Sequence, residues 1–207
     1  MLKKYGDNDM AAEIKKLKSD DVYQLKITLN EVYPDIWRRF VVEADIKLPD
    51  LHKVIQTVMG WDNAHLHIFR IDKKLYSPPD EEFDGPYVDY RKTKLNQVVT
   101  AEQQKFFYDY DFGDGWEHTL VLEKILLKEK GAKYPVCVEG ERNCPPDDCG
   151  GPFGYMELQK TIADPRNDEY EEMMDWLGGD FDPEEFYIDD INEMLQEKDY
   201  GCIELFD

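Results

Sequence analysis

The chain has 207 residues with 42% hydrophobic content, enough for the core of one domain, and a formal net charge of -21. This charge argues against direct nucleic-acid binding, which depends on Lys and Arg that neutralise phosphates, and it is compatible with a basic protein partner or a bound cation. No apolar stretch suits a membrane span, no signal peptide is evident and four cysteines make no disulfide framework, so we expect a cytoplasmic protein.

The first predicted elements are an extension and a hairpin. Residues 1–19 are expected to be an N-terminal extension, with a short helix at residues 8–18, and residues 20–200 a single domain. Apolar and polar residues alternate at residues 22–29 and again at residues 36–43, which predicts two half-buried strands. Because the connection between them is short, we expect antiparallel pairing.

Arg38 lies in an apolar row of the second of these strands. Burying a guanidinium is expensive unless a carboxylate accompanies it. Either this face of the strand meets solvent, or Arg38 forms a structural ion pair with an acid. We favour the ion pair, for which Asp111 is one candidate.

A helix and a third strand follow. Apolar spacing predicts a helix over residues 49–59 that ends at Gly60, and alternation predicts a strand over residues 65–71. On such a strand His65 and His67 point to the same side, a geometry that metal sites use. Two structural histidines produce the same pattern, and this interpretation is favoured.

A β-hairpin is predicted around Gly113-Asp114-Gly115, because two alternating runs flank it and glycine supplies the positive φ of a tight turn. In the second run, Trp116 and His118 share an apolar face. Asp111, Asp114, Trp116 and His118 are therefore candidate site residues. Aspartates also bond to turn amides, and we favour that role for Asp114.

Two further candidates lie in or near a proline- and glycine-rich loop at residues 140–155. Cys137, Cys144 and Cys149 could bind zinc together with His118, although their spacing is not that of a C-x2-C pair and free cysteines are favoured. Asp147-Asp148 could hold a divalent cation. These two acids could equally be polar loop residues that cap the next helix, and the sequence does not decide between these alternatives.

The C-terminal part is predicted to be helical and acidic. Helices are expected over residues 155–162 and 168–177, with another beginning at Asp182-Pro183. Residues 168–199 hold 14 acids and one base. The fold class is therefore α+β, with a mostly antiparallel sheet, one helix inserted between strands and acidic helices at the C-terminus.

Several short motifs, taken together and in order, resemble the plasmid pRiA4b ORF-3-like family over about residues 20–197. The motifs are Ile36-Trp37-Arg38-Arg39, Leu51-His52, Gly60-Trp61, His65-Leu66-His67, Tyr110-Asp111-Phe112-Gly113-Asp114, Trp116-Glu117-His118, Cys144-Pro145-Pro146-Asp147-Asp148 and Gly150-Gly151. The resemblance implies a compact α+β domain and supplies no catalytic residues. Some members are labelled transposon passenger or resolvase-like proteins, and Asp147 stands where many relatives have Glu.

Three functional hypotheses follow. The first is a non-enzymatic interaction or binding module with a loop-lined site at residues 77–90, 111–118 and 140–155. The second is a metal-assisted enzyme that uses zinc, such as a hydrolase. The third is a recombinase accessory or DNA-binding protein of mobile elements, against which the lack of a basic stripe counts. For the first two, we expect Asp111 and His118 to lie close to residues 144–149.

The charge generates a prediction about DNA. At physiological salt the protein should show no appreciable affinity for a fluorescently labelled DNA duplex in an anisotropy titration, because a chain of net charge -21 repels phosphates. Submicromolar binding with a steep dependence on salt would contradict it.

Overall fold

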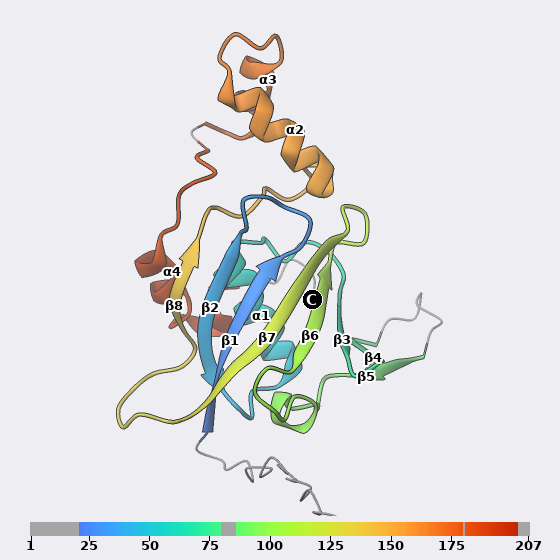
Figure 1. The fold of residues 1–207 in the computed structure, drawn as a ribbon, viewed down its shortest axis with the longest axis vertical. Coiled ribbons are helices and arrows are strands. Elements are labelled where there is room, and N and C mark those ends of the chain that lie inside the picture. The colour runs from blue at the N-terminus through green and yellow to red at the C-terminus, as the bar shows by residue number, and fades with distance from the viewer. Residues whose placement is uncertain (1–20, 80–85, 180, 203–207) are drawn as a thin grey trace, which may run out of the picture.

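The computed structural model describes residues 21–79, 86–179 and 181–202. Its centre is an eight-stranded sheet of order β5-β4-β3-β6-β7-β1-β2-β8, in which only the β4–β5 pair is parallel (Figure 1). The strands are β1 (Asp21–Leu29), β2 (Trp37–Glu43), β3 (His67–Ile71), β4 (Lys74–Ser77), β5 (Tyr87–Asp89), β6 (Lys105–Tyr110), β7 (Trp116–Leu127) and β8 (Val136–Glu141).

Helices lie on one face, one edge and one end of this sheet. Helix α1 covers one face, α4 lies beside β8, and α2 with α3 projects beyond the ends of the strands (Figure 1). The helices of the described residues are α1 (Leu48–Met59), α2 (Gly151–Ala163), α3 (Tyr170–Trp176) and α4 (Ile188–Met194), with 3-10 turns η1 (Leu95–Gln97) and η2 (Lys198–Gly201). The α+β class is thus confirmed. None of these helices is both long and apolar enough to cross a membrane.

The core forms between α1 and the sheet. Every second side chain of β1 is fully buried, and the apolar stripe of α1 joins the same cluster, with Gly60 ending the helix at a φ of 104°. Each such side chain contributes on the order of 2 kcal/mol by leaving water. The paired stripes are Tyr23, Leu25, Ile27 and Leu29 of β1 and Leu51, Val54, Ile55 and Val58 of α1.

Helix α4 protects the edge of the sheet at β8. The Asn192 side chain accepts a hydrogen bond from the Cys137 backbone N–H at 2.8 Å and donates one to the Cys137 carbonyl at 2.9 Å. Gln196 adds a donor to the Pro135 carbonyl at 3.0 Å. These amides occupy backbone groups that a further strand would otherwise use.

The prediction of a helix that begins at Asp182 is wrong. The chain forms a turn there, in which the Glu184 N–H donates to Asp182 Oδ1 at 2.9 Å, and α4 begins at Ile188. The Pro183 carbonyl accepts from the Asn143 N–H at 2.9 Å, so tertiary bonding holds this backbone out of a helix. The helix expected at residues 8–18 lies outside the described residues.

A closed ring of hydrogen bonds is buried between α1 and β6. The Asn63 backbone N–H donates to Gln56 Oε1 at 2.9 Å, which leaves the Gln56 amide to donate to the Tyr108 hydroxyl at 2.8 Å. The hydroxyl then donates to His52 Nδ1 at 2.8 Å, and His52 Nε2 donates to Asn63 Oδ1 at 2.8 Å. Burial lowers the pKa of His52, so its imidazole is neutral, and Asn63 Oδ1, which can only accept, places the single ring proton on Nε2.

Acid should destabilise the protein through His52. Burial chiefly lowers the pKa of His52 to about 4, with the Asn63 hydrogen bond opposing and the Lys53 charge adding to the shift. An unfolded histidine titrates at about 6.5, so the stabilisation from neutral His52 is complete above that pH and is lost as the pH falls toward 4. We expect the free energy of unfolding, measured with urea, to fall by roughly 1.4 kcal/mol per pH unit in this window from His52 alone.

The matched variant is His52→Gln, whose amide keeps a donor and an acceptor but does not titrate. Its free energy of unfolding should depend less steeply on pH over the same window. Carboxylates such as Asp109, whose pKa burial raises, titrate in both proteins and cancel in the comparison. Parallel curves for parent and variant would show that His52 is not the titrating group.

Candidate functional site

The β6–β7 hairpin is confirmed, and its turn is built by Asp111 as well as by glycine. Tyr110 pairs with Trp116, so residues 111–115 form the turn. Asp111 has a φ of 52°, and its Oδ1 accepts the Gly113 N–H at 2.9 Å. Gly115 has a φ of 73°, whereas Gly113 does not have positive φ. Because Oδ1 accepts hydrogen bonds within the turn, Oδ2 is the Asp111 oxygen that contacts a residue outside it.

Asp114 joins this turn to the loop before α2. Its Oδ2 accepts the Gly150 N–H at 3.0 Å. A Cβ at Gly151 would lie only 2.2 Å from the Asp114 carbonyl oxygen, so the loop and the turn are in direct backbone contact there. The expected proximity of Asp111 to residues 144–149 is consistent with this junction.

The same loop also contacts the segment after α1. Asp147 Oδ2 accepts the Asp62 N–H at 3.0 Å, while its Oδ1 is buried and makes no hydrogen bond among the described residues. Burial raises the pKa of Asp147, the Asp62 N–H opposes this effect, and the charge of Asp62 adds to it. Four aspartates thus lie in three segments that meet at this end of the sheet, including Asp111 and Asp114.

His65 lies among these acids and completes a possible metal-binding group. Its Nε2 is 3.6 Å from Asp111 Oδ2 and 3.4 Å from Asp148 Oδ1, and the three ligand atoms all lie within 4.8 Å of one another. Ligands bound to one ion at about 2.1 Å are separated by about 3–4 Å, so the two His65 distances suit a common ion. The Nε2 atom of His65 is buried and makes no hydrogen bond to the described residues.

The backbone around this cluster is unusual. Asp111, Asp148 and Asn63 all adopt left-handed conformations, with φ values of 52°, 60° and 57°. Aspartate and asparagine tolerate this region better than other residues with a Cβ, yet each still stores some strain. Such strain gathers at binding and catalytic sites, where it fixes the direction of a side chain.

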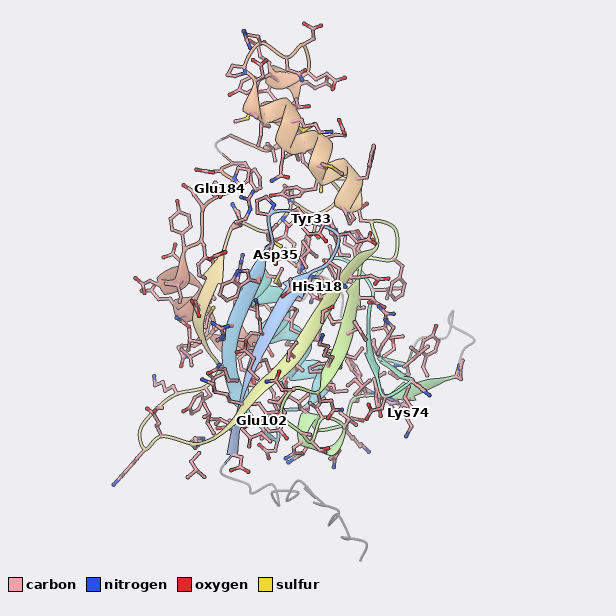
Figure 2. All side chains as sticks on the ribbon, viewed as in Figure 1. Tyr33, Asp35, Lys74, Glu102, His118 and Glu184 are labelled. Atoms are coloured by element: carbon pink, nitrogen blue, oxygen red, sulfur yellow. The ribbon has the colours of Figure 1, made fainter. Side chains whose placement is uncertain are left out.

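The proposed zinc ligands Cys137, Cys144, Cys149 and His118 do not come together. Among the described residues, the metal-binding geometry belongs to His65, Asp111 and Asp148 instead. His118, labelled in Figure 2, is fully buried; its Nδ1 donates to the Tyr108 carbonyl at 3.1 Å, and Trp61 Nε1 donates to its Nε2 at 3.4 Å. This alternative to the favoured interpretation of free cysteines fails at His118, because strand alternation directs His118 into the core, where Trp116 is equally buried.

The pairing of His65 with His67 is also wrong. Strand β3 begins only at His67, so alternation does not extend back to His65. His67 stacks on His52 with ring centroids 3.5 Å apart, and its Nε2 is 2.8 Å from the Tyr90 hydroxyl. The two histidines therefore lie in different environments: His67 packs in the structural core, and His65 lies in the acidic cluster.

Arg38 is buried, but no carboxylate among the described residues forms an ion pair with it, so the expected ion pair is wrong. The guanidinium donates to the carbonyls of Val58 at 2.8 Å, Trp37 at 2.9 Å and Glu141 at 2.7 Å, and it lies 4.5 Å from the Phe186 ring centroid. Val58 is in the last turn of α1, where the helix dipole is negative. Backbone carbonyls replace the acid, and burial lowers the pKa of Arg38.

The chain is similar to known proteins over most of its length. The sequence model of the plasmid pRiA4b ORF-3-like protein family matches residues 21–190. The uncharacterized protein y4hQ of Sinorhizobium fredii is 39% identical over 178 residues, which are 85% of this chain and 91% of that protein. The crystal structure of MM3350, a protein of unknown function from Methanosarcina mazei Go1, superimposes with a TM-score of 0.76 at 38% identity, covering 84% of this chain and 98% of the other.

Two glycine variants should separate backbone strain from the contact at the loop. Gly151→Ala should lower the free energy of unfolding by roughly 2–4 kcal/mol, because its Cβ meets both positive φ and the Asp114 carbonyl. Gly115→Ala has the same kind of φ but open space around its Cβ, so it should cost only about 1 kcal/mol. Urea denaturation measures both, and equal losses would show that the turn and loop do not touch in solution.

Proposed function

We propose that this chain, which belongs to the plasmid pRiA4b ORF-3-like family, is a binding module that works with a divalent metal ion. The metal ligands are His65, Asp111 and Asp148. The observation that carries the proposal is the spacing of their three ligand atoms, within 4.8 Å, around a His65 nitrogen that has no hydrogen bond to the described residues.

The chemistry of the ligands favours particular metals. An imidazole with carboxylates suits Mn²⁺, Fe²⁺ or Zn²⁺, whereas Mg²⁺ and Ca²⁺ prefer oxygen ligands throughout. A divalent ion would also offset the mutual repulsion of Asp111, Asp148 and the neighbouring Asp147. Mn²⁺ is a practical probe because its binding can be followed directly by electron paramagnetic resonance.

The surrounding loops support a role in binding. Phe112 of the β6–β7 turn lines a small hollow with Pro78 and Tyr87, which places these two residues next to the turn. The Asp114–Gly150 hydrogen bond joins that turn to residues 140–155. Three protein ligands leave coordination positions open, and the Asp148 side chain is 76% exposed, so an oxygen of a bound partner could complete the metal's coordination.

One observation favours metal-assisted hydrolysis as a second candidate. Asp147 Oδ1 is buried beside the cluster and makes no hydrogen bond among the described residues, so it could hold a metal-bound water. Hydrolysis that requires Mn²⁺ and is lost in Asp148→Asn would support this role. We do not extend either role to DNA, because the acids around the cluster repel phosphates.

Metal binding tests the proposal directly. Titration of the full chain with Mn²⁺, followed by calorimetry and paramagnetic resonance, should show one site. Asp148→Asn should weaken Mn²⁺ binding by about tenfold or more, because it removes a charged ligand while the amide keeps the left-handed backbone. His65→Gln should weaken it similarly.

The matched control is Asp35→Asn, in the β1–β2 turn (labelled in Figure 2), which removes the same charge from a residue that is not one of the three ligands. Its Mn²⁺ affinity should stay within about twofold of the parent. Denaturation curves establish that each variant is folded. Parent-like Mn²⁺ binding by both His65→Gln and Asp148→Asn, or no binding of Mn²⁺ or Zn²⁺ by the parent, would overturn the proposal.

A further inference from the structure

A cavity of about 370 Å³ lies beside the proposed metal ligands, between α2, α3 and the loop that carries Asp148. It belongs to the part of the molecule that projects beyond the strands (Figure 1). Asp148 lines this cavity and also faces His65, so the cavity and the cluster share a wall. A volume of this size accommodates one large side chain or a small ligand.

The inside of the cavity is apolar on one side. Leu158 of α2 is buried at 2% exposure, and Met173 of α3 is half-buried. Trp176, in the last turn of α3, lines the cavity while remaining 50% exposed. An aliphatic chain could pack against Leu158 and Met173, and the face of an exposed indole attracts cations.

The rim of the cavity is acidic. Asp148, Glu169 and Glu172 contribute three carboxylates, and no basic residue is among those that line it. Glu169 and Glu172 are exposed and make no ion pair with the described residues. Apolar walls with the unpaired carboxylates of Glu169 and Glu172 complement a Lys or Arg side chain, whose stem is apolar and whose head is cationic.

We propose that this cavity receives a lysine or arginine side chain from a basic segment of a partner protein. This assignment rests on the proposed metal function, because a backbone carbonyl oxygen of the same segment would take an open position on the ion beside Asp148. Residues 168–199 hold 14 acids and one base, so the surrounding field attracts a basic partner and speeds its association.

The test uses the full chain loaded with Mn²⁺ and a fluorescently labelled peptide of alternating lysine and glycine. Anisotropy should show binding that weakens with salt, and a glutamine–glycine peptide of the same length should bind at least about tenfold more weakly. Glu169→Gln/Glu172→Gln should weaken binding of the lysine peptide by about tenfold. Trp176→Leu should weaken it severalfold, because the aromatic face is lost.

The matched control is Glu193→Gln/Glu197→Gln, which removes two exposed charges from the C-terminal part without touching the cavity. It should bind the lysine peptide within about twofold of the parent. Equal weakening by both double variants would mean that only the overall charge matters, which overturns the cavity assignment. If spermine binds as tightly as the peptide with the same dependence on Glu169 and Glu172, the occupant is a small polyamine and the peptide assignment fails.

The two proposals fail separately. Mn²⁺ affinity, measured without peptide, should be unchanged in Glu169→Gln/Glu172→Gln, because neither residue is a metal ligand. If Mn²⁺ binds as proposed but the peptide ignores this double variant, the cavity assignment falls and the metal site stands. If the parent binds no Mn²⁺ while peptide binding depends on Glu169 and Glu172, the metal proposal and the carbonyl contact to the ion fall, and only the contact between the cationic side chain and the cavity stands.

Discussion

The buried hydrogen-bond ring of His52, Gln56, Asn63 and Tyr108 is the constraint on which the acidic end of the molecule depends. It ties two turns of α1 to β6 and fixes the segment that leaves the helix. Each of its bonds contributes on the order of 1 kcal/mol, but an unpaired member would cost more where the ring is buried, at His52, Gln56 and Tyr108. His65 follows Asn63 by two residues, so the ring determines where this imidazole meets Asp111.

The acidic cluster is held together by the backbone rather than by opposite charges. Asp111 and Asp114 accept backbone N–H groups of the turn and the loop, and Asp147 accepts one from the segment after α1. Carboxylates bonded to amides stay close to one another even though their charges repel. The arrangement therefore fixes the positions of several negative groups and leaves their net charge for a cation to balance.

The periodicity of the sequence predicted β1, β2, β7 and α1 well, because one face of each is buried in a single core, but it did not predict β5, whose side chains are not buried. It could not predict the candidate site, which forms where regular elements end. His65 precedes β3, so alternation placed it wrongly with His67, while alternation within β7 correctly placed His118 in an apolar row that turned out to be core. The carbonyl partners of Arg38 come from three elements, and no pattern within one element could identify them.

The side-chain amide of Asn192 pairs with the backbone N–H and C=O of Cys137 at the β8 edge, as a neighbouring strand would. This has a consequence for truncation of the chain. The backbone groups of Cys137 at the sheet edge are hydrogen-bonded only after the acidic C-terminal region has docked, because their partner, the Asn192 side chain, lies more than 50 residues away in the sequence. Loss of α4 would expose unpaired backbone N–H and C=O groups at the β8 edge, and another chain could pair with them. Solubility of the chain is thus tied to the docking of α4 against β8.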